Sequence, residues 1–96
     1  MKVYIWSAER AGDKIRALRA QRGLLLREVA EGTGVSRQML GYYEQGRKMI
    51  PPTAMATIAS FFQVSLEDLF FDLVNKEDYD GNYYEEDEDS VEQETT

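Results

Sequence analysis

The sequence predicts an all-α fold, a compact bundle of five short helices followed by a disordered acidic C-terminal tail. Apolar residues recur at helical spacing up to about residue 75, glycine or proline separates these periodic segments, and acidic residues dominate from about Lys76 onward. A chain of 96 residues suffices for one domain with a single core. We therefore divide it into an N-terminal extension (1–12), a helical domain (13–75) and an acidic tail (76–96).

The first helix is expected over Asp13–Gln21, where Ile15 and Leu18 fall on one face and Gly23 ends the helix. Ahead of it, Lys2–Trp6 is the only strand-like stretch of the sequence, and no internal repeat is found.

The second and third helices are expected over Leu26–Gly32 and Ser36–Gln45. Gly34 supplies the turn between them, Ser36 can cap the third helix, and Gly46 ends it at a position that needs a positive φ. The apolar positions of these and later helices should form the core. They include Val29, Ala30, Leu40, Tyr43, Ile58 and Phe62.

Pro51 and Pro52 open the fourth helix, because proline fits the first helical turn. Its apolar residues follow i, i+3, i+4, i+7 spacing at Met55, Ile58, Ala59 and Phe62. Ser65 then caps the fifth helix, with Asp68 three residues on as in a capping box. The apolar residues that follow this cap are Leu69, Phe70, Leu73 and Val74.

Charge divides the chain into two unlike parts. Residues 1–71 hold ten basic and seven acidic residues, net +3, whereas residues 72–96 hold eleven acidic residues and only Lys76, net -10. The whole-chain charge of -7 therefore hides a mildly basic folded part that suits a nucleic-acid partner.

The tail has too few aliphatic residues to offset its ordering entropy, so we expect it to be disordered. Three roles are open for it: a solubility element, a competitor of DNA for the basic face, or a docking site for a partner protein. Its alternating Asp78, Asp80 and Asn82 suggest a calcium loop. However, Tyr83 and Asp89 stand where such a loop needs glycine and a bidentate glutamate, so no metal is expected.

Composition argues against an enzyme. The chain has no histidine and no cysteine, which removes the common metal clusters, thiol nucleophiles and imidazole bases, and no cofactor is expected. No segment has the length of a signal h-region or a membrane span, so the sequence favours a cytoplasmic protein without membrane contact.

The stretch Leu24–Arg47 has the pattern of a helix-turn-helix that binds double-stranded DNA. Arg37 and Gln38 open its second helix and Tyr42 lies one turn along, which makes these three the candidates for base readout in the major groove. The alternative is that Arg37 and Gln38 form a solvated helix face and that Tyr42 contacts sugar or a partner. Backbone-positioning groups are expected at Arg27, Ser36, Arg47 and Lys48.

Three charged residues nearby are given other roles. Arg16 and Arg19 are interpreted as surface solubilisers, and Glu44 is expected to accept hydrogen bonds or to pair with a basic group.

Correctly spaced residues cover about Gly12 to Phe71. They are Ile15-Arg16-x-Leu18-Arg19, Gly23-Leu24, Val29-Ala30, Gly34-Val35-Ser36-Arg37, Leu40, Tyr43-Glu44-x-Gly46-Arg47, Ile58-Ala59 and Val64-Ser65-Leu66-Glu67-Asp68-Leu69-Phe70. In these residues the chain resembles the Cro and lambda-repressor-like family of Xre-type regulators. The resemblance implies a five-helix lambda-repressor-like domain and a sequence-specific transcription regulator, commonly a dimer on a palindromic operator.

Leu25 and Leu26 depart from that family, which usually has a Thr or Ser cap followed by a phosphate-binding Gln. They could pack on the N-terminal segment, contact sugar or bind a protein. Two functions are therefore open. One is a repressor that binds a palindromic operator; the other is an antitoxin or anti-repressor that binds a partner protein through the acidic tail or through Leu25 and Leu26.

A homodimer is expected through the fifth helix and its continuation, because the apolar residues there exceed what one small bundle can cover. The expected interface residues are Phe70, Phe71, Leu73 and Val74. The alternative is that these residues pack back onto the first helix or onto Trp6.

Overall fold

The computed structural model describes residues 1–78. Its first helix is α1 (Ala8–Gln21). It begins at Ser7, whose Oγ accepts a hydrogen bond from the Arg10 backbone N–H at 3.0 Å. The helix thus starts five residues before the expected Asp13. Gly12, which disfavours helix on its own, lies inside α1 because it is buried against the end of α3 (Arg37–Glu44) and leaves no room for a side chain.

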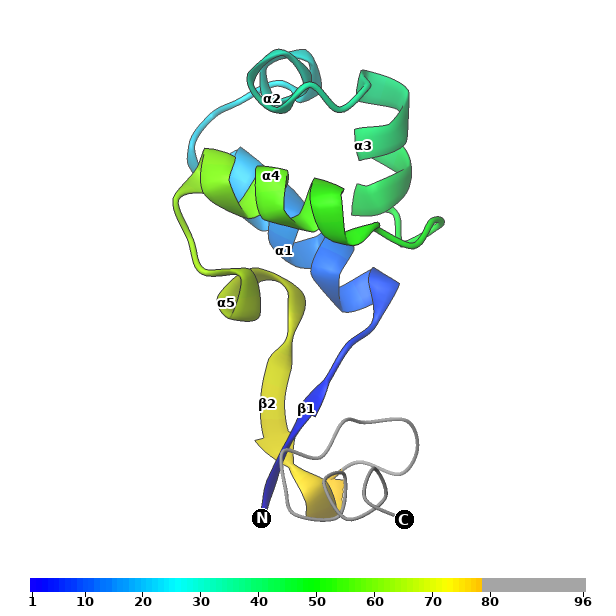
Figure 1. Cartoon of the computed structure of the whole chain (residues 1–96), viewed down its shortest axis with the longest axis vertical. Helices are drawn as coiled ribbons and strands as arrows, with labels where there is room; N and C mark the ends of the chain where they lie inside the picture. Colours follow the sequence, from blue (N-terminus) through cyan, green and yellow to red (C-terminus); the bar gives the residue numbers. More distant parts are fainter. Residues whose placement is uncertain (79–96) are drawn as a thin grey trace.

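The remaining helices begin and end close to where their caps and glycines predicted. They are α2 (Leu26–Thr33), α3, α4 (Pro52–Phe62) and α5 (Leu66–Phe70). Ser65 caps α5 as expected, since its Oγ accepts a hydrogen bond from Asp68 N at 3.0 Å. The five α-helices of residues 1–78 pack around one core, and Figure 1 shows α4 in front of α1 with α2 and α3 at one end of the molecule. The all-α bundle is confirmed.

At the other end, the N-terminal strand β1 (Lys2–Ile5) pairs with β2 (Asp72–Asn75) in a two-stranded antiparallel sheet (Figure 1). Val3 faces Val74 and Tyr4 faces Leu73 across this sheet. The expected strand at Lys2–Trp6 is therefore confirmed, but its partner was missed.

Leu73 and Val74 lie in β2, so the expectation that helical structure continues past Phe70 is wrong. The chain leaves α5 at Phe71, whose backbone is extended (φ -127°, ψ 149°). Pairing with β1 gives alternate residues of Asp72–Asn75 backbone hydrogen bonds, and Lys76 N donates to Met1 O at 2.8 Å to close the sheet.

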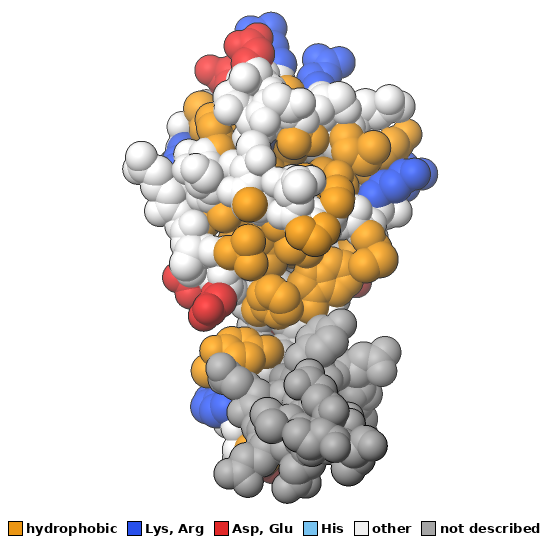
Figure 2. All heavy atoms as spheres, viewed as in Figure 1, with side chains coloured by type: hydrophobic (Ala, Val, Ile, Leu, Met, Phe, Trp, Pro, Cys, Tyr) orange, Lys and Arg blue, Asp and Glu red, His pale blue; other side chains and the backbone are white. Residues whose placement is uncertain are grey.

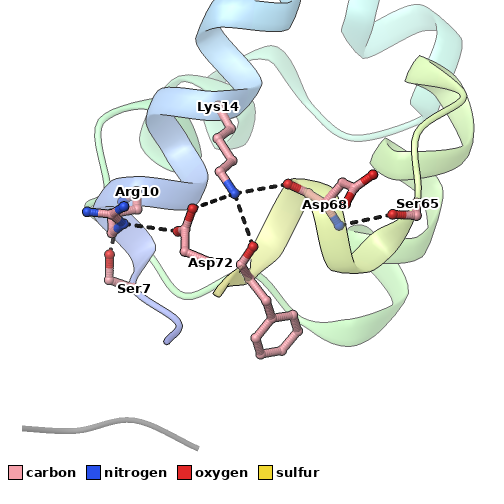
Figure 3. Close-up of polar contacts among 7 residues, drawn as sticks. Ser7, Arg10, Lys14, Ser65, Asp68 and Asp72 are labelled. Atoms are coloured by element: carbon pink, nitrogen blue, oxygen red, sulfur yellow. Dashed lines mark hydrogen bonds and ion pairs between the residues drawn. The ribbon is translucent and has the colours of Figure 1, made fainter. Parts of the chain in front are cut away.

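Three side chains fix the junction between α1 and the start of β2 (Figure 3). Lys14 Nζ donates to Asp68 O at 2.9 Å and to Phe71 O at 3.1 Å, and it pairs with Asp72 Oδ1 at 2.8 Å. Arg10 Nε donates to the other carboxylate oxygen of Asp72 at 3.0 Å. Lys14 thus satisfies carbonyls at the end of α5 and turns the chain toward β1.

The core contains the residues expected from the apolar spacing, with Ala30 packed at its edge. None of the helices in residues 1–78 is long and apolar enough to cross a membrane. The predicted start of the disordered tail at Lys76 is wrong, because Lys76–Asp78 form a short 3-10 helix, η1, after β2. The rest of the predicted tail and its possible roles fall on residues 79–96, outside the described residues, as does most of the alternating acidic pattern that begins at Asp78.

Candidate nucleic-acid interface

The turn between α2 and α3 is built by a glycine and two hydroxyls. Gly34 has a φ of 78°, and its N–H donates to Ala30 O at 2.8 Å, which ends α2. Thr33 Oγ1 accepts from Val35 N at 3.1 Å, and Ser36 Oγ accepts from Met39 N at 3.1 Å to cap α3. These local bonds set the angle at which α3 leaves the turn.

The inner side of α3 is held by the core and by a buried ion pair. Leu40 and Tyr43 are buried, and burial raises the pKa of the Tyr43 hydroxyl. Arg19 of α1 donates two hydrogen bonds to the Glu44 carboxylate, Nε to Oε2 at 2.7 Å and Nη2 to Oε1 at 3.0 Å. A third bond joins Arg19 Nη1 to Leu24 O at 3.0 Å.

The pairing expected for Glu44 is therefore confirmed, whereas the interpretation of Arg19 as a surface solubiliser is wrong. Its hydrogen bond to Glu44 raises the pKa of Arg19, and this outweighs the lowering caused by burial. The ion pair joins residues 25 positions apart, so no local pattern in the sequence identified it.

The outer side of α3 carries the residues expected to touch DNA, and we call Arg37, Gln38, Tyr42, Arg47 and Lys48 the recognition face. Arg37 and Gln38 are exposed, and Gln38 Nε2 donates to the Tyr42 hydroxyl at 3.1 Å. Arg47 Cζ lies 5.1 Å from the centre of the Tyr42 ring and Lys48 Nζ lies 5.8 Å from it, within cation–π range. The structure thus brings all five residues to one surface.

Gly46 explains how two residues beyond the end of α3 come back over Tyr42. Its φ of 70° reverses the chain directly after the helix, and its Cα faces the backbone of Glu9 in α1, where a Cβ would come within 2.9 Å of Glu9 Cα. The sequence predicts the helix end at this glycine, but it carries no signal for the stacking of Arg47 and Lys48 on Tyr42.

Arg27 and Arg37 line a shallow groove together with Arg19, Leu25 and Leu26. Leu25 occupies the N-cap of α2 and cannot accept a hydrogen bond; instead, Glu28 Oε1 accepts from Leu25 N at 2.8 Å. The Leu25 side chain is 51% exposed, and Leu26 packs against the core. The family's usual cap is therefore replaced by a bond from Glu28, and an apolar side chain stands beside two guanidinium groups.

The four residues expected at the dimer interface lie in different environments in the structure. Phe70 is only 1% exposed and belongs to the core, so its apolar surface is already covered within the chain and its assignment to an interface is corrected. Phe71 is half-buried and makes an edge-on contact with Tyr4, whereas Leu73 is 52% exposed on the same side of the sheet. Val74 lies on the opposite side, across from Val3.

Cationic side chains line part of the α2–α3 end of the molecule, and acidic side chains lie beside them at its tip (Figure 2). In Figure 2 the Lys and Arg side chains visible on the helical part lie mostly along the margin that carries α2 and α3, while the middle of this face, over α4, is largely apolar. Within residues 1–78, no group of three or more acidic side chains is arranged to hold a metal ion. The site thus offers hydrogen-bond donors and positive charge to a ligand.

Comparison with known proteins agrees with this geometry. A family model described as helix-turn-helix matches residues 15–69, which is more than half of the chain. The chain belongs to this helix-turn-helix family. Its members, the Xre-type regulators, are DNA-binding transcription regulators, so the resemblance seen in the sequence is confirmed.

Solved structures of helix-turn-helix proteins share the fold. The clp gene regulator ClgR from C. glutamicum is 34% identical with a TM-score of 0.60, covering 65% of this chain and 80% of that protein. The BldD DNA-binding domain from S. venezulae is 32% identical with a TM-score of 0.59, covering 66% and 94%. The restriction-modification controller protein C.AhdI from Aeromonas hydrophila, at 24% identity and a TM-score of 0.63, covers 66% and 96% and supports the fold alone. The comparison with curated proteins found no match.

Proposed function

We propose that this helix-turn-helix protein is a repressor that binds a palindromic operator and reads its bases with α3 in the major groove. The observation that carries the proposal is the recognition face, where Arg37 and Gln38 stand exposed at the N-terminal end of a helix whose inner side is fixed. Arginine can make two hydrogen bonds to guanine and glutamine two to adenine. The regulators of known structure that share this fold, ClgR and the BldD domain among them, support a role in transcription.

Within this proposal the recognition face divides into base readers and backbone binders. Arg37 and Gln38 read bases, while Arg47 and Lys48 bind phosphates, which carry affinity without sequence information. Arg27 is exposed beside Arg37 and extends the backbone contact along α2. The Ser36 hydroxyl accepts the capping bond from Met39 N, and its own hydrogen is left to donate to a phosphate.

In the free protein Tyr42 accepts a hydrogen bond from Gln38. We therefore assign Tyr42 a role in positioning Gln38, in addition to any base contact. The bond from Gln38 Nε2 to the Tyr42 hydroxyl uses one of the two amide hydrogens. The Oε1 acceptor and the second hydrogen therefore stay available for the two bonds to adenine.

Binding measurements separate these roles. Arg37→Ala is expected to cost about 1 to 3 kcal/mol on the operator and to relax the preference at one base pair, whereas Arg47→Ala should weaken operator and random duplexes alike and flatten the salt dependence. The operator is first selected from the DNA upstream of the gene and from a random duplex pool. Equal losses for Arg37→Ala on both duplexes would remove Arg37 from the base readers.

Tyr42→Phe tests positioning, because it removes the hydroxyl and keeps the ring under Arg47 and Lys48. We expect a loss of about 0.5 to 1.5 kcal/mol on the operator, confined to the base pair that Gln38→Ala also relaxes. A loss spread equally over random DNA would contradict this assignment.

The repressor is proposed to act as a homodimer that pairs through the sheet and presents two α3 helices to half-sites about one helical turn apart. Support comes from the apolar surface of Phe71 and the exposed Leu73 beside Tyr4; Val74 lies on the opposite side of the sheet. Sedimentation at micromolar concentration is expected to show a dimer that Leu73→Glu dissociates, with Leu66→Glu on α5 as a matched exposed control. A monomer that binds one half-site would exclude the dimer.

One observation favours a second function, that of an antitoxin or anti-repressor. Leu25 is exposed where the family usually presents polar groups to DNA, so this edge could bind a partner protein. A band shift with upstream DNA and a pull-down of neighbouring gene products distinguish the two. Specific DNA binding that survives Leu25→Ser supports the repressor, whereas a partner lost on Leu25→Ser, without DNA binding by either form, supports the alternative.

A further inference from the structure

We propose that residues 79–96 occupy the recognition face in the free protein and compete there with nonspecific DNA. The inference rests on the function proposed for that face and adds its regulation. The recognition face is basic, and residues 79–96 of the same chain are acidic, so the two carry opposite charge.

The cations of the recognition face have no carboxylate partner within residues 1–78. By contrast, Arg10 and Lys14 pair with Asp72, and Arg19 pairs with Glu44, so the fold neutralises cations of α1 and leaves those of the recognition face open. In the part of the chain that the structure describes, Arg47 donates a 3.4 Å hydrogen bond to the neutral amide of Gln45 and stacks on Tyr42, with no carboxylate beside it. This surface is therefore ready for an anion before DNA arrives.

The acidic segment supplies the matching charge. Residues 79–96 hold eight acidic residues and no basic one, whereas residues 1–78 hold eleven basic and ten acidic residues. Carboxylates and phosphates bind arginine through the same pair of parallel hydrogen bonds. The segment can therefore replace DNA phosphates at Arg37 and Arg47, but it cannot reproduce the base edges that Arg37 and Gln38 read.

Chain length permits the contact. The last described residue, Asp78, lies at the sheet end of the molecule, opposite α2 and α3 (Figure 1). The longest extent of the molecule is 46 Å, and eighteen residues can span up to about 60 Å. Tethering holds such a segment at an effective concentration of about millimolar, which suffices for a weak electrostatic contact.

Competition of this kind sharpens specificity. The segment opposes the electrostatic part of DNA binding, which operator and random DNA share, and leaves the base contacts untouched. Nonspecific complexes lose most of their affinity to it, and the operator complex loses less. Added salt screens both the segment and the phosphates, so the difference should shrink as ionic strength rises.

A spin label on the full-length chain tests the contact directly. The sequence has no cysteine, so Ser90→Cys provides a single labelling site within the acidic segment. At low salt we expect the label to broaden the amide resonances of residues 37–48 more than those of residues 57–65, and we expect salt or random duplex DNA to reverse this. The control carries the same label with all eight acidic residues of 79–96 replaced by their amides. Equal broadening of the two regions in the wild-type segment would overturn the proposal.

Binding by the same full-length variants provides the functional measurement. Relative to the wild-type chain, the neutral segment should raise affinity for random DNA on the order of three- to tenfold at low salt and raise operator affinity less. An unchanged affinity for random DNA overturns the competition. Preferential broadening of residues 37–48 in a chain that binds no DNA would support the contact and refute the proposed repressor, so the two failures are distinguishable.

Discussion

Two ion-pair junctions connect helix α1 to the rest of the molecule, and they differ in the solvent exposure of their side chains and in the geometry of the pairing. At the α3 junction, Arg19 and Glu44 form a two-pronged pair whose carboxylate side chain is 7% exposed. At the sheet junction, Lys14 and Arg10 share the Asp72 carboxylate, whose side chain is 17% exposed; the Arg10 side chain is 46% exposed, compared with 21% for Arg19. The first junction fixes the helix that carries the recognition face, and the second fixes the sheet proposed to pair two copies.

This difference indicates that stability and function are distributed unevenly along α1. When a buried ion pair loses one partner, the remaining charge is unpaired and shielded from water, which costs free energy. In a more exposed pair, water hydrates the remaining charge at little cost. Damage at the α3 junction should therefore unfold the domain and misplace α3, while damage at the sheet junction should loosen the sheet and spare DNA binding by the folded monomer. Three substitutions test this contrast, from the largest expected effect to the smallest.

Glu44→Ala should have the largest effect, a loss of about 3 kcal/mol in the free energy of unfolding, because it leaves the Arg19 guanidinium partly buried without its carboxylate. Urea denaturation followed by circular dichroism measures this loss at fixed protein concentration. DNA affinity should fall as well, since α3 loses its main polar tie to α1.

Glu44→Gln is the matched control, because the amide keeps one acceptor for Arg19 and removes only the charge. We expect an intermediate loss of about 1 to 2 kcal/mol. A loss below about 0.5 kcal/mol for Glu44→Ala would place the pair among ordinary surface ion pairs and erase the contrast between the two junctions.

Gly12→Ala tests the packing beneath the same junction. A Cβ at Gly12 would overlap the carbonyl oxygen of Tyr43 and lie 2.9 Å from that of Glu44, so α1 and α3 must separate. Alanine favours helix by roughly 1 kcal/mol over glycine, yet we expect a net loss of about 1 to 3 kcal/mol in unfolding free energy.

The control for Gly12→Ala is Gly41→Ala in α3, where an added Cβ would meet nothing within 4 Å. This variant should unfold at an equal or higher urea concentration than wild type, because only the helix preference changes. A stabilised Gly12→Ala protein would show that α1 and α3 can separate without cost.

The contrast between the junctions also explains which features could be predicted from the sequence. Helices α2 to α5 were predicted nearly in place because their ends depend on neighbouring residues, as the Ser36 cap, the Gly34 turn and the Ser65 cap show. Arg37 and Gln38 could be assigned to an exposed face by the same local periodicity.

Long-range contacts carry no such local signal. The partners Arg19 and Glu44 are 25 residues apart, and β2 pairs with a strand some seventy residues earlier. A four-residue segment, Asp72–Asn75, with two polar ends does not show a strand pattern on its own, and its apolar residues fit a helix extension equally well. Only the pairing with β1 and the Lys14 bonds to Asp68 and Phe71 decide that it is a strand.

Asp72→Asn is the smallest of the three changes, with an expected loss of about 1 kcal/mol in unfolding free energy at neutral pH, because the amide keeps the shape of the carboxylate and its neighbours are partly in water. DNA affinity of the folded monomer should be unchanged, whereas dimer formation should weaken as the sheet loosens. A variant that dimerises like wild type but binds operator poorly would reverse the roles assigned to the two junctions.

The pH dependence of Asp72→Asn separates charge from shape. Burial alone would raise the pKa of Asp72, but hydrogen bonds from Lys14 and Arg10, and their positive charges, outweigh it and hold the pKa below the ordinary 3.8. A lowered carboxyl pKa adds stability at pH values above the ordinary pKa, and this stability is lost as the pH falls through the lower pKa of the folded state.

The difference in unfolding free energy between wild type and Asp72→Asn should therefore be constant from neutral pH down to about pH 5 and should vanish in stronger acid. Urea denaturation of both proteins at a series of pH values measures this difference directly. A difference that persists unchanged below pH 3 would show that the Asp72 contribution comes from shape and hydrogen bonding rather than from its charge, and the sheet junction would then resemble the α3 junction more closely than its exposure suggests.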